Sequence, residues 1–107
     1  MENLTTRDNQ EAVGLLEVFG LVCAFLAADA GCKAANVHLQ VFDKNKPANA
    51  DALPVPLIIC IKFRGSVVDV TAAVDAAQEV AERSTGMVSR YIISGPDEGT
   101  QMMFGLN

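Results

Sequence analysis

Apolar and polar positions along the chain predict six regular elements. Four segments predict β-strands, either because apolar residues alternate with polar ones or because a short apolar run is flanked by turn residues: 12–18, 37–42, 57–63 and 87–93. Two longer segments predict helices, 21–36 and 66–83. The order strand, helix, strand, strand, helix, strand is typical of a ferredoxin-like α/β (α+β) fold, βαββαβ, with a four-stranded antiparallel sheet and both helices on one face.

The two predicted helices differ in their polarity. The segment 21–36 carries only two charges, Asp29 and Lys33, and six of its first fifteen residues are Ala, so almost no face is left for water. A domain of about 100 residues has limited means of covering such a helix from within. We therefore expect other subunits to cover it.

The second helix has a normal solvated side. Ser66 followed by Asp69 is a capping pattern, an apolar stripe runs along one face, and Glu79 and Glu82 lie off that stripe. Gly86 is expected to end the helix. Gly14, inside the first strand, indicates close approach by another backbone.

The connection between the second and third strands is unusually long. It runs over 43–56 and holds three of the four prolines of the chain, whereas hairpin loops commonly have two to five residues. Long, stiff loops on a compact domain are often functional.

Composition and charge limit the classes of partner. The chain has 107 residues, which fits one domain over 11–96 between a polar extension, 1–10, and a tail, 97–107. Half of the residues are apolar and the mean hydropathy is +0.26, which indicates an oligomer. The net charge of −5 disfavours nucleic acid and anionic membranes, and no signal peptide or membrane span is evident, so a cytoplasmic protein is expected.

No constellation of an enzyme is recognisable. His38 is the single histidine, and the cysteines, Cys23, Cys32 and Cys60, lack the spacing of a metal site. Cys23 and Cys32 should lie on opposite sides of one helix. We expect no catalytic residues, no metal and no cofactor. The polar group Asp29, Lys33 and Asn36 has two interpretations: an internal ion pair at i, i+4, or a polar strip at the edge of a subunit.

The run EAVGLLEVFGLVCAFLAADAGCKAANVHL, from Glu11 to Leu39, closely resembles the opening of bacterial microcompartment shell proteins (BMC domain) of the hexamer-forming, unpermuted type. Their D-x-x-x-K-A-A-N-V segment is matched from Asp29 to Val37, and Arg64-Gly65 and Val88-Ser89 match further on. The resemblance implies a structural shell protein: homohexamers tile into the wall of a cytoplasmic organelle together with other shell proteins, enclose enzymes, and pass small metabolites through a central pore.

Two site assignments follow from the resemblance. Asp29, Lys33 and Asn36 would lie at the hexamer edge, where Lys33 faces its symmetry mate; Gly95 stands where relatives carry an Arg, so we expect weaker tiling. The loop between strands two and three would surround the pore, and its unusual length predicts an occluded or restructured pore. The candidate pore residues are Lys44, Asn45, Lys46, Pro47, Ala48, Asn49, Ala50, Asp51 and Ala52.

Two questions stay open at the level of sequence. The tail gathers Met102, Met103, Phe104 and Leu106, which either pack back on the domain, as a short helix or tail, or contact a neighbouring subunit or cargo protein. The alternative to a shell protein is an oligomeric ferredoxin-like regulatory module that binds a small effector.

Overall fold

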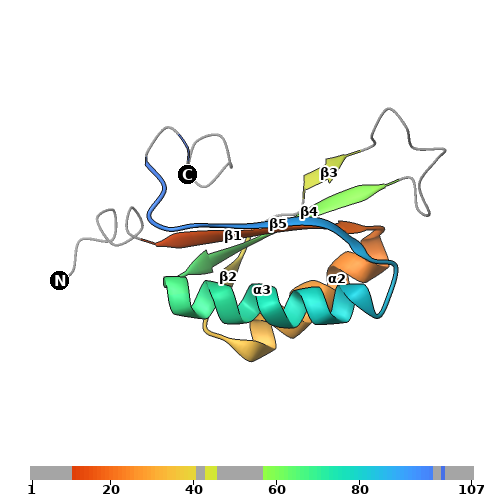
Figure 1. The fold of residues 1–107 in the computed structure, drawn as a ribbon, viewed down its shortest axis with the longest axis horizontal. Coiled ribbons are helices and arrows are strands. Elements are labelled where there is room, and N and C mark those ends of the chain that lie inside the picture. Colours follow the sequence, from red (N-terminus) through yellow and green to blue (C-terminus); the bar gives the residue numbers. More distant parts are fainter. Residues whose placement is uncertain (1–10, 41–42, 46–56, 98–99, 101–107) are drawn as a thin grey trace.

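The computed structural model describes residues 11–40, 43–45, 57–97 and 100. Its elements are β1 (Ala12–Phe19), α2 (Leu21–Ala34), β2 (His38–Leu39), β3 (Asp43–Asn45), β4 (Ile58–Gly65), α3 (Val67–Glu82) and β5 (Met87–Ile93). The strand order is β2-β4-β1-β5, all neighbours are antiparallel, and β3 also pairs with β4. Both helices lie on one face of the sheet (Figure 1), which confirms the predicted α+β class.

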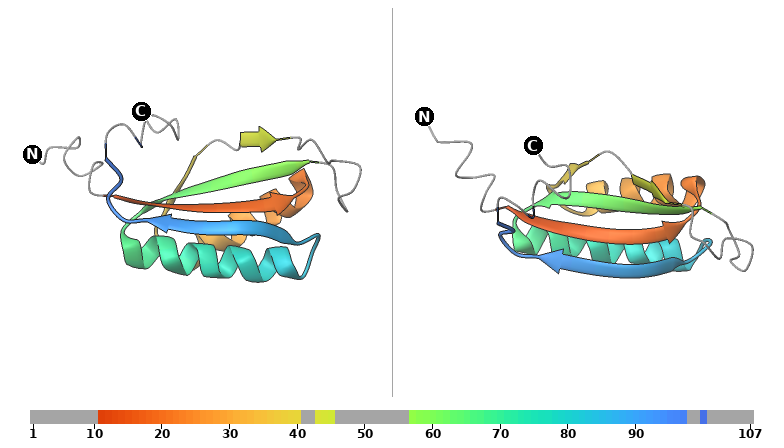
Figure 2. Two further views of the ribbon diagram at one scale, coloured as in Figure 1. Left: turned by 45° about the horizontal axis from the view of Figure 1, so that its top comes forward. Right: turned by 90° about the horizontal axis from the view of Figure 1, so that it is seen from above.

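The two helices divide the covered face of the sheet between them. α2 contacts α3, β4 and the edge strand β2, whereas α3 contacts β1, β4 and the opposite edge strand, β5. Figure 2 shows α2 toward the β2–β4 side and α3 toward the β5 side. The domain therefore has one flank formed by α2 with β2 and another formed by α3 with β5.

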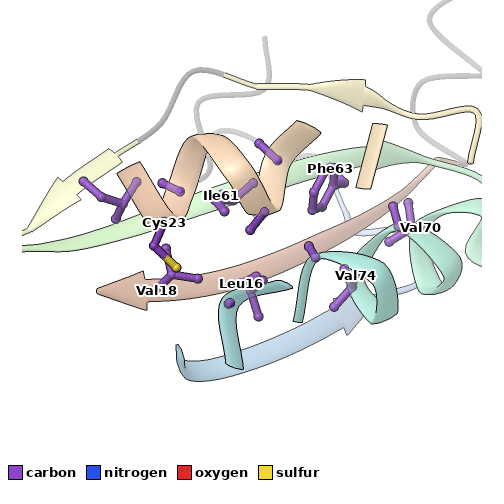
Figure 3. Packing of buried hydrophobic residues seen from close by; sticks show 14 of the residues in the cluster. Leu16, Val18, Cys23, Ile61, Phe63, Val70 and Val74 are labelled. Carbon is purple, nitrogen blue, oxygen red and sulfur yellow. The ribbon is translucent and has the colours of Figure 1, made fainter. Parts of the chain in front are cut away.

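The core lies between the sheet and the two helices. Its largest fully buried side chains include Leu16 of β1, Phe63 of β4, and Val70 and Val74 of α3. Figure 3 shows Phe63 next to α2, while Val70 and Val74 reach from α3 toward the sheet. Full burial of each such side chain contributes about 1.5–3 kcal/mol, so this cluster fixes the two-layer architecture.

Two glycines permit this close packing. A Cβ atom on Gly14 would lie 2.5 Å from Cγ1 of Val70. The approach at Gly14 thus comes from side chains of α3, and the expectation that another backbone approaches there is wrong. A Cβ atom on Gly31 would lie 2.5 Å from Cζ of Phe63, so only Gly at this position lets α2 lie directly on β4.

The prediction of one continuous second strand over 37–42 is wrong. Leu39 pairs with Phe63 and Asp43 pairs with Cys60, so four residue steps on one side match three on β4. Between Leu39 and Asp43 the chain has one residue more than β4 has between Phe63 and Cys60. The alternation is therefore broken, and the paired segments β2 and β3 are separate elements. The predicted loop also begins too early, because Asp43–Asn45 is a strand.

The other predicted boundaries need only small changes. α2 ends at Ala34 rather than at Asn36, and β4 continues to Gly65. The hydroxyl of Ser66 accepts a hydrogen bond from the backbone N–H of Asp69, which confirms the predicted cap of α3. The helix ends at Glu82, and Gly86, at φ 101°, donates its N–H to the carbonyl of Ala81. The segments 1–10, 46–56 and 101–107 lie outside the described residues.

Candidate functional site

The candidate edge residues and the two described candidate pore residues, Lys44 and Asn45, lie at opposite ends of the sheet. β1 begins opposite Gly65 and ends opposite Ile58, and Asn45 of β3 also pairs with Ile58. An antiparallel strand rises about 3.4 Å per residue, so roughly 24 Å separate the two ends. We call them the Gly65 end and the Ile58 end.

The Gly65 end gathers three segments that are far apart in the sequence. The carbonyl oxygen of Asn36 lies 3.2 Å from the position that a Cβ atom on Gly65 would take. Ile93 pairs with Val13 at the same end, and Gly95 follows two residues later. The fold thus brings Asn36, the last turn of α2 and Gly95 to one end of the domain.

Lys33 and Asp29 form an ion pair on the outer surface of α2. Nζ of Lys33 lies 2.8 Å from Oδ2 of Asp29, and both side chains are exposed, at 76% and 61%. The hydrogen bond to Asp29, and then its charge, raise the pKa of Lys33, so the ammonium form is favoured. The pair predicted at i, i+4 therefore exists, and its exposure leaves Lys33 accessible to another molecule.

Gly95 adopts a conformation that suits glycine. Its φ is +59°, and a Cβ atom placed on it would meet nothing within 4 Å. A larger side chain would thus find space but would need left-handed backbone, which costs an ordinary residue roughly 1–2 kcal/mol. The resemblance predicts an Arg at this place, and this chain has Gly95 there in a left-handed conformation.

The Ile58 end carries the start of the candidate pore segment. Lys44 and Asn45 lie in β3, opposite Ile59 and Ile58. The other seven candidates, residues 46–52, lie outside the described residues. β3 and Leu57, the described residues on either side of 46–56, both lie at the Ile58 end.

The outer surface of α2 is apolar over its first two turns. Val22, Phe25 and Leu26 are exposed at 73%, 59% and 51%, whereas the residues that face the core are small: Ala24, Ala27, Ala28 and Gly31. Within one chain the helix is thus covered on its small-residue side alone. The sequence identified the helix but not this division, which the spacing of its small residues could have revealed.

The cysteines of α2 lie on opposite sides, as the sequence predicts. Cys23 is buried, and Cys32 is exposed. Partial burial, and then the nearby charge of Asp29, raise the pKa of Cys32, so its thiol form is favoured. Cys60 is partly buried on β4, and His38 is exposed on β2. Among the described residues no group of three His, Cys, Asp or Glu side chains could hold a metal ion.

A model of the BMC domain family matches residues 12–96. This chain belongs to the BMC domain family. The chain is 38% identical over 97 residues to the bacterial microcompartment shell protein EutK of Salmonella typhimurium, an alignment that covers 88% of this chain and 52% of EutK. It is 33% identical over 92 residues to the carboxysome shell protein CcmK2 of Synechococcus elongatus, covering 84% of this chain and 81% of CcmK2.

The fold of the chain also matches the solved structure of a microcompartment protein. The chain superposes on a microcompartment protein from Desulfitobacterium hafniense with a TM-score of 0.63 and 27% identity, over 83% of this chain and 43% of the other. The chain spans about half the length of EutK. In the part of the chain that the structure describes, no helix is long and apolar enough to cross a membrane.

Proposed function

We propose that this chain is a structural, non-enzymatic shell protein of a bacterial microcompartment and that it forms cyclic hexamers in the wall of that cytoplasmic organelle. The observation that carries the proposal is the outer surface of α2, where Val22, Phe25 and Leu26 face water in a single chain of the BMC family. Apolar patches of this kind mark contacts with other proteins. The names of the relatives, shell proteins of microcompartments and carboxysomes, supply the class of assembly.

The arrangement of the two ends fits a flat ring. If the Ile58 end points to the ring axis, residues 44–52 surround a central pore through which small metabolites pass. The Gly65 end then points outward, and Lys33 and Asn36 meet the next hexamer. The two ends are roughly 24 Å apart, so one end of a subunit lines the pore while the other contacts the next hexamer.

The mass in solution tests the ring. Six copies of the 11.3 kDa chain give about 68 kDa, to be measured by light scattering or native mass spectrometry. A chain that stays monomeric or forms dimers at micromolar concentration contradicts the hexamer. Nothing among the described side chains favours the alternative, an effector-binding module.

Tiling of hexamers should be weak because Gly95 supplies no side chain to the neighbouring ring. We expect electron micrographs at ordinary salt to show separate hexamers or strips rather than extended flat sheets. The variant Gly95→Arg should restore a charge-assisted donor and increase sheet formation. Extended sheets of the wild-type protein would contradict the importance assigned to this position.

A further inference from the structure

One end of the sheet is buried on both of its faces. Gly14 of β1 and Phe63 of β4 point toward α3 and α2. Side chains alternate along a strand, so Val13 and Lys62 point to the face opposite the helices. Even there, Val13 is only 1% exposed and Lys62 only 6%.

None of the described helices and strands accounts for this burial. Both helices lie on the other face of the sheet (Figure 1), and Val13 is not part of the apolar cluster between the sheet and the helices. One face of an antiparallel sheet is commonly solvated, so an uncovered Val13 and Lys62 should keep contact with water. Because these exposures are those of a single chain, the cover must come from the same chain.

The covered area is limited to the Gly65 end of β1 and β4. Arg64, opposite Val13, forms an ion pair of 3.1 Å with Glu11, and their side chains are 17% and 20% exposed. In contrast, Tyr91 of β5 lies on the same face and is 65% exposed. We call Glu11, Val13, Lys62 and Arg64 the covered corner.

The longer segments outside the described residues are 1–10, 46–56 and 101–107. The segment 46–56 joins β3 to β4 at the Ile58 end, roughly 20 Å from the covered corner. The segment 1–10 is polar apart from Met1 and Leu4. The segment 101–107 contains large apolar side chains, namely Met102, Met103, Phe104 and Leu106. Exclusion of water from an apolar surface needs apolar side chains, which favours 101–107 as the cover.

The chain leaves β5 toward the covered corner. Ile93 of β5 is opposite Val13, and Gly95, at φ +59°, lets the chain turn just after the strand. Figure 1 shows the chain after β5 on the side of the sheet opposite the helices. Pro96, the next residue, is buried. The last described residues therefore lead onto the face that is covered.

Asp97 begins a helical turn. Its Oδ1 atom accepts a hydrogen bond of 2.7 Å from the backbone N–H of Thr100, which is the arrangement of a helix N-cap, and the backbone of Thr100 is helical. An α-helix rises about 1.5 Å per residue, so a helix from Asp97 to Phe104 would span roughly 10 Å, or about two strand spacings. Such a helix, starting beside β5, reaches across β1 to β4.

We propose that the segment after Asp97 forms a short helix and packs its apolar side chains, from Met102 to Leu106, on the covered corner. Val13 and the methylene groups of Lys62 supply the apolar floor of this contact. The segment then belongs to the domain and is not a free surface for a neighbouring subunit or a cargo protein. The proposal does not depend on the ring, because it concerns a single chain.

Chemical labelling of lysines measures the cover. Acetylation of the full chain by an N-hydroxysuccinimide ester, followed by mass spectrometry, gives the rate at each lysine. Lys33, whose side chain is 76% exposed, is the internal reference, and Lys62 should react at least about tenfold more slowly. Deletion of 101–107 should raise the rate at Lys62 to near that at Lys33 while circular dichroism still shows a folded domain.

Two substitutions in the full-length chain test the helix itself, even if the deletion destabilises the domain. Asp97→Ala removes the cap and should raise the rate at Lys62 about fivefold. Asp97→Asn keeps a side chain that caps helices well, so the rate should stay close to that of the wild type.

Two controls identify the segment and the chain that supply the cover. Deletion of 1–10 should leave Lys62 protected. An isotope-labelled chain that lacks 101–107, mixed with an excess of the full chain, should keep a reactive Lys62, since each segment covers its own domain.

The opposite results overturn the proposal. A Lys62 as reactive as Lys33 in the full chain means that nothing covers the corner, and a Lys62 still protected in the folded deletion variant means that 101–107 does not. Loss of protection on deletion of 1–10 assigns the cover to that segment or to the general stability of the domain. Protection of the labelled chain in the mixture shows that the segment crosses to a neighbour, and equal rates in Asp97→Ala and the wild type contradict the capped helix.

Discussion

α2 and α3 cover the same face of the same sheet, yet their packing follows opposite patterns. α3 buries Val70 and Val74 and turns Asp75 and Glu79 toward water, as an amphipathic helix does. α2 buries Ala and Gly and turns Val22, Phe25 and Leu26 outward. Apart from Val67 and Val68 in its first turn, α3 has its apolar residues covered within one chain, whereas α2 leaves an apolar surface in water over its first two turns.

The difference has a geometric origin. Small residues let α2 lie close to α3 and to Phe63, since Gly31 leaves no room for even one methyl group. The larger side chains of the helix cannot enter that contact and are left on the other side. The fold thus gains a thin, tightly packed layer at the cost of an exposed apolar surface.

Replacing one Val by Ala in each helix should give the largest difference in the free energy of unfolding. Val74→Ala should lower the free energy of unfolding by about 2 kcal/mol, because Val74 is fully buried in the core. Val22→Ala, at a residue 73% exposed, should change it by less than about 0.5 kcal/mol. Urea unfolding at concentrations where the chain is monomeric measures both, and similar losses would mean that α2 is covered within the chain.

Adding a single methyl group on the inner side of α2 should destabilise the domain. Gly31→Ala is favoured by helix propensity but forces the helix away from the ring of Phe63 and the carbonyl of Ala73, for a net loss of about 1–2 kcal/mol. The control Cys32→Ala, at the next, exposed residue, should have little effect. A Gly31→Ala domain more stable than the wild type would refute the close packing.

Removal of the N-terminal cap should lower the stability of α3, whereas α2 has no such cap to remove. Ser66→Ala removes the hydroxyl that accepts from the N–H of Asp69 and should cost about 1 kcal/mol, measured by thermal or urea unfolding. α2 begins after Gly20 without any side-chain cap, so no substitution there removes a cap hydrogen bond. Ser84→Ala, in the turn after α3, serves as the control and should be neutral.

The smallest effect concerns the charged end of α2. The hydrogen bond that Lys33 donates to Asp29 raises the pKa of Lys33 above its ordinary 10.5, so any stability from the pair is present below that pH and is lost as the pH rises through the raised value. In Asp29→Asn the pKa of Lys33 should fall toward 10.5. NMR titration of the lysine side chains measures this shift, and an unchanged value would show that the pair does not persist in solution.

The sequence was informative wherever the cause is local. Ser66 and Asp69 are three residues apart, and Asp29 and Lys33 are four apart, so helical geometry alone brings each pair together. The order of strands and helices followed from periodicity in the same way. The second strand was predicted too long because its alternation continues through 37–42, while pairing with β4 requires one extra residue between Leu39 and Asp43.

The candidate sites also depend on contacts between residues that are far apart in the sequence. The candidate edge and pore residues were named by resemblance, and strand pairing over long separations in the sequence puts Gly95 at one end of the sheet and Lys44 and Asn45 at the other. The exposed apolar side of α2 was not predicted. Apolar–polar periodicity does not separate the two sides of a helix in which nearly every residue is apolar, and only the spacing of its small residues marks the buried side.

By itself the sequence determined the elements apart from the division of the second strand, their order and the cap of α3, and it set Asp29 and Lys33 at the spacing of an ion pair. It also predicts an outside partner for α2. Hydrogen bonds and side-chain spacing within a few residues are enough to specify these features. Only the tertiary structure decided which side of α2 is buried, because that choice depends on Phe63 and Ala73, more than thirty residues away, and on the absence of a side chain at Gly31.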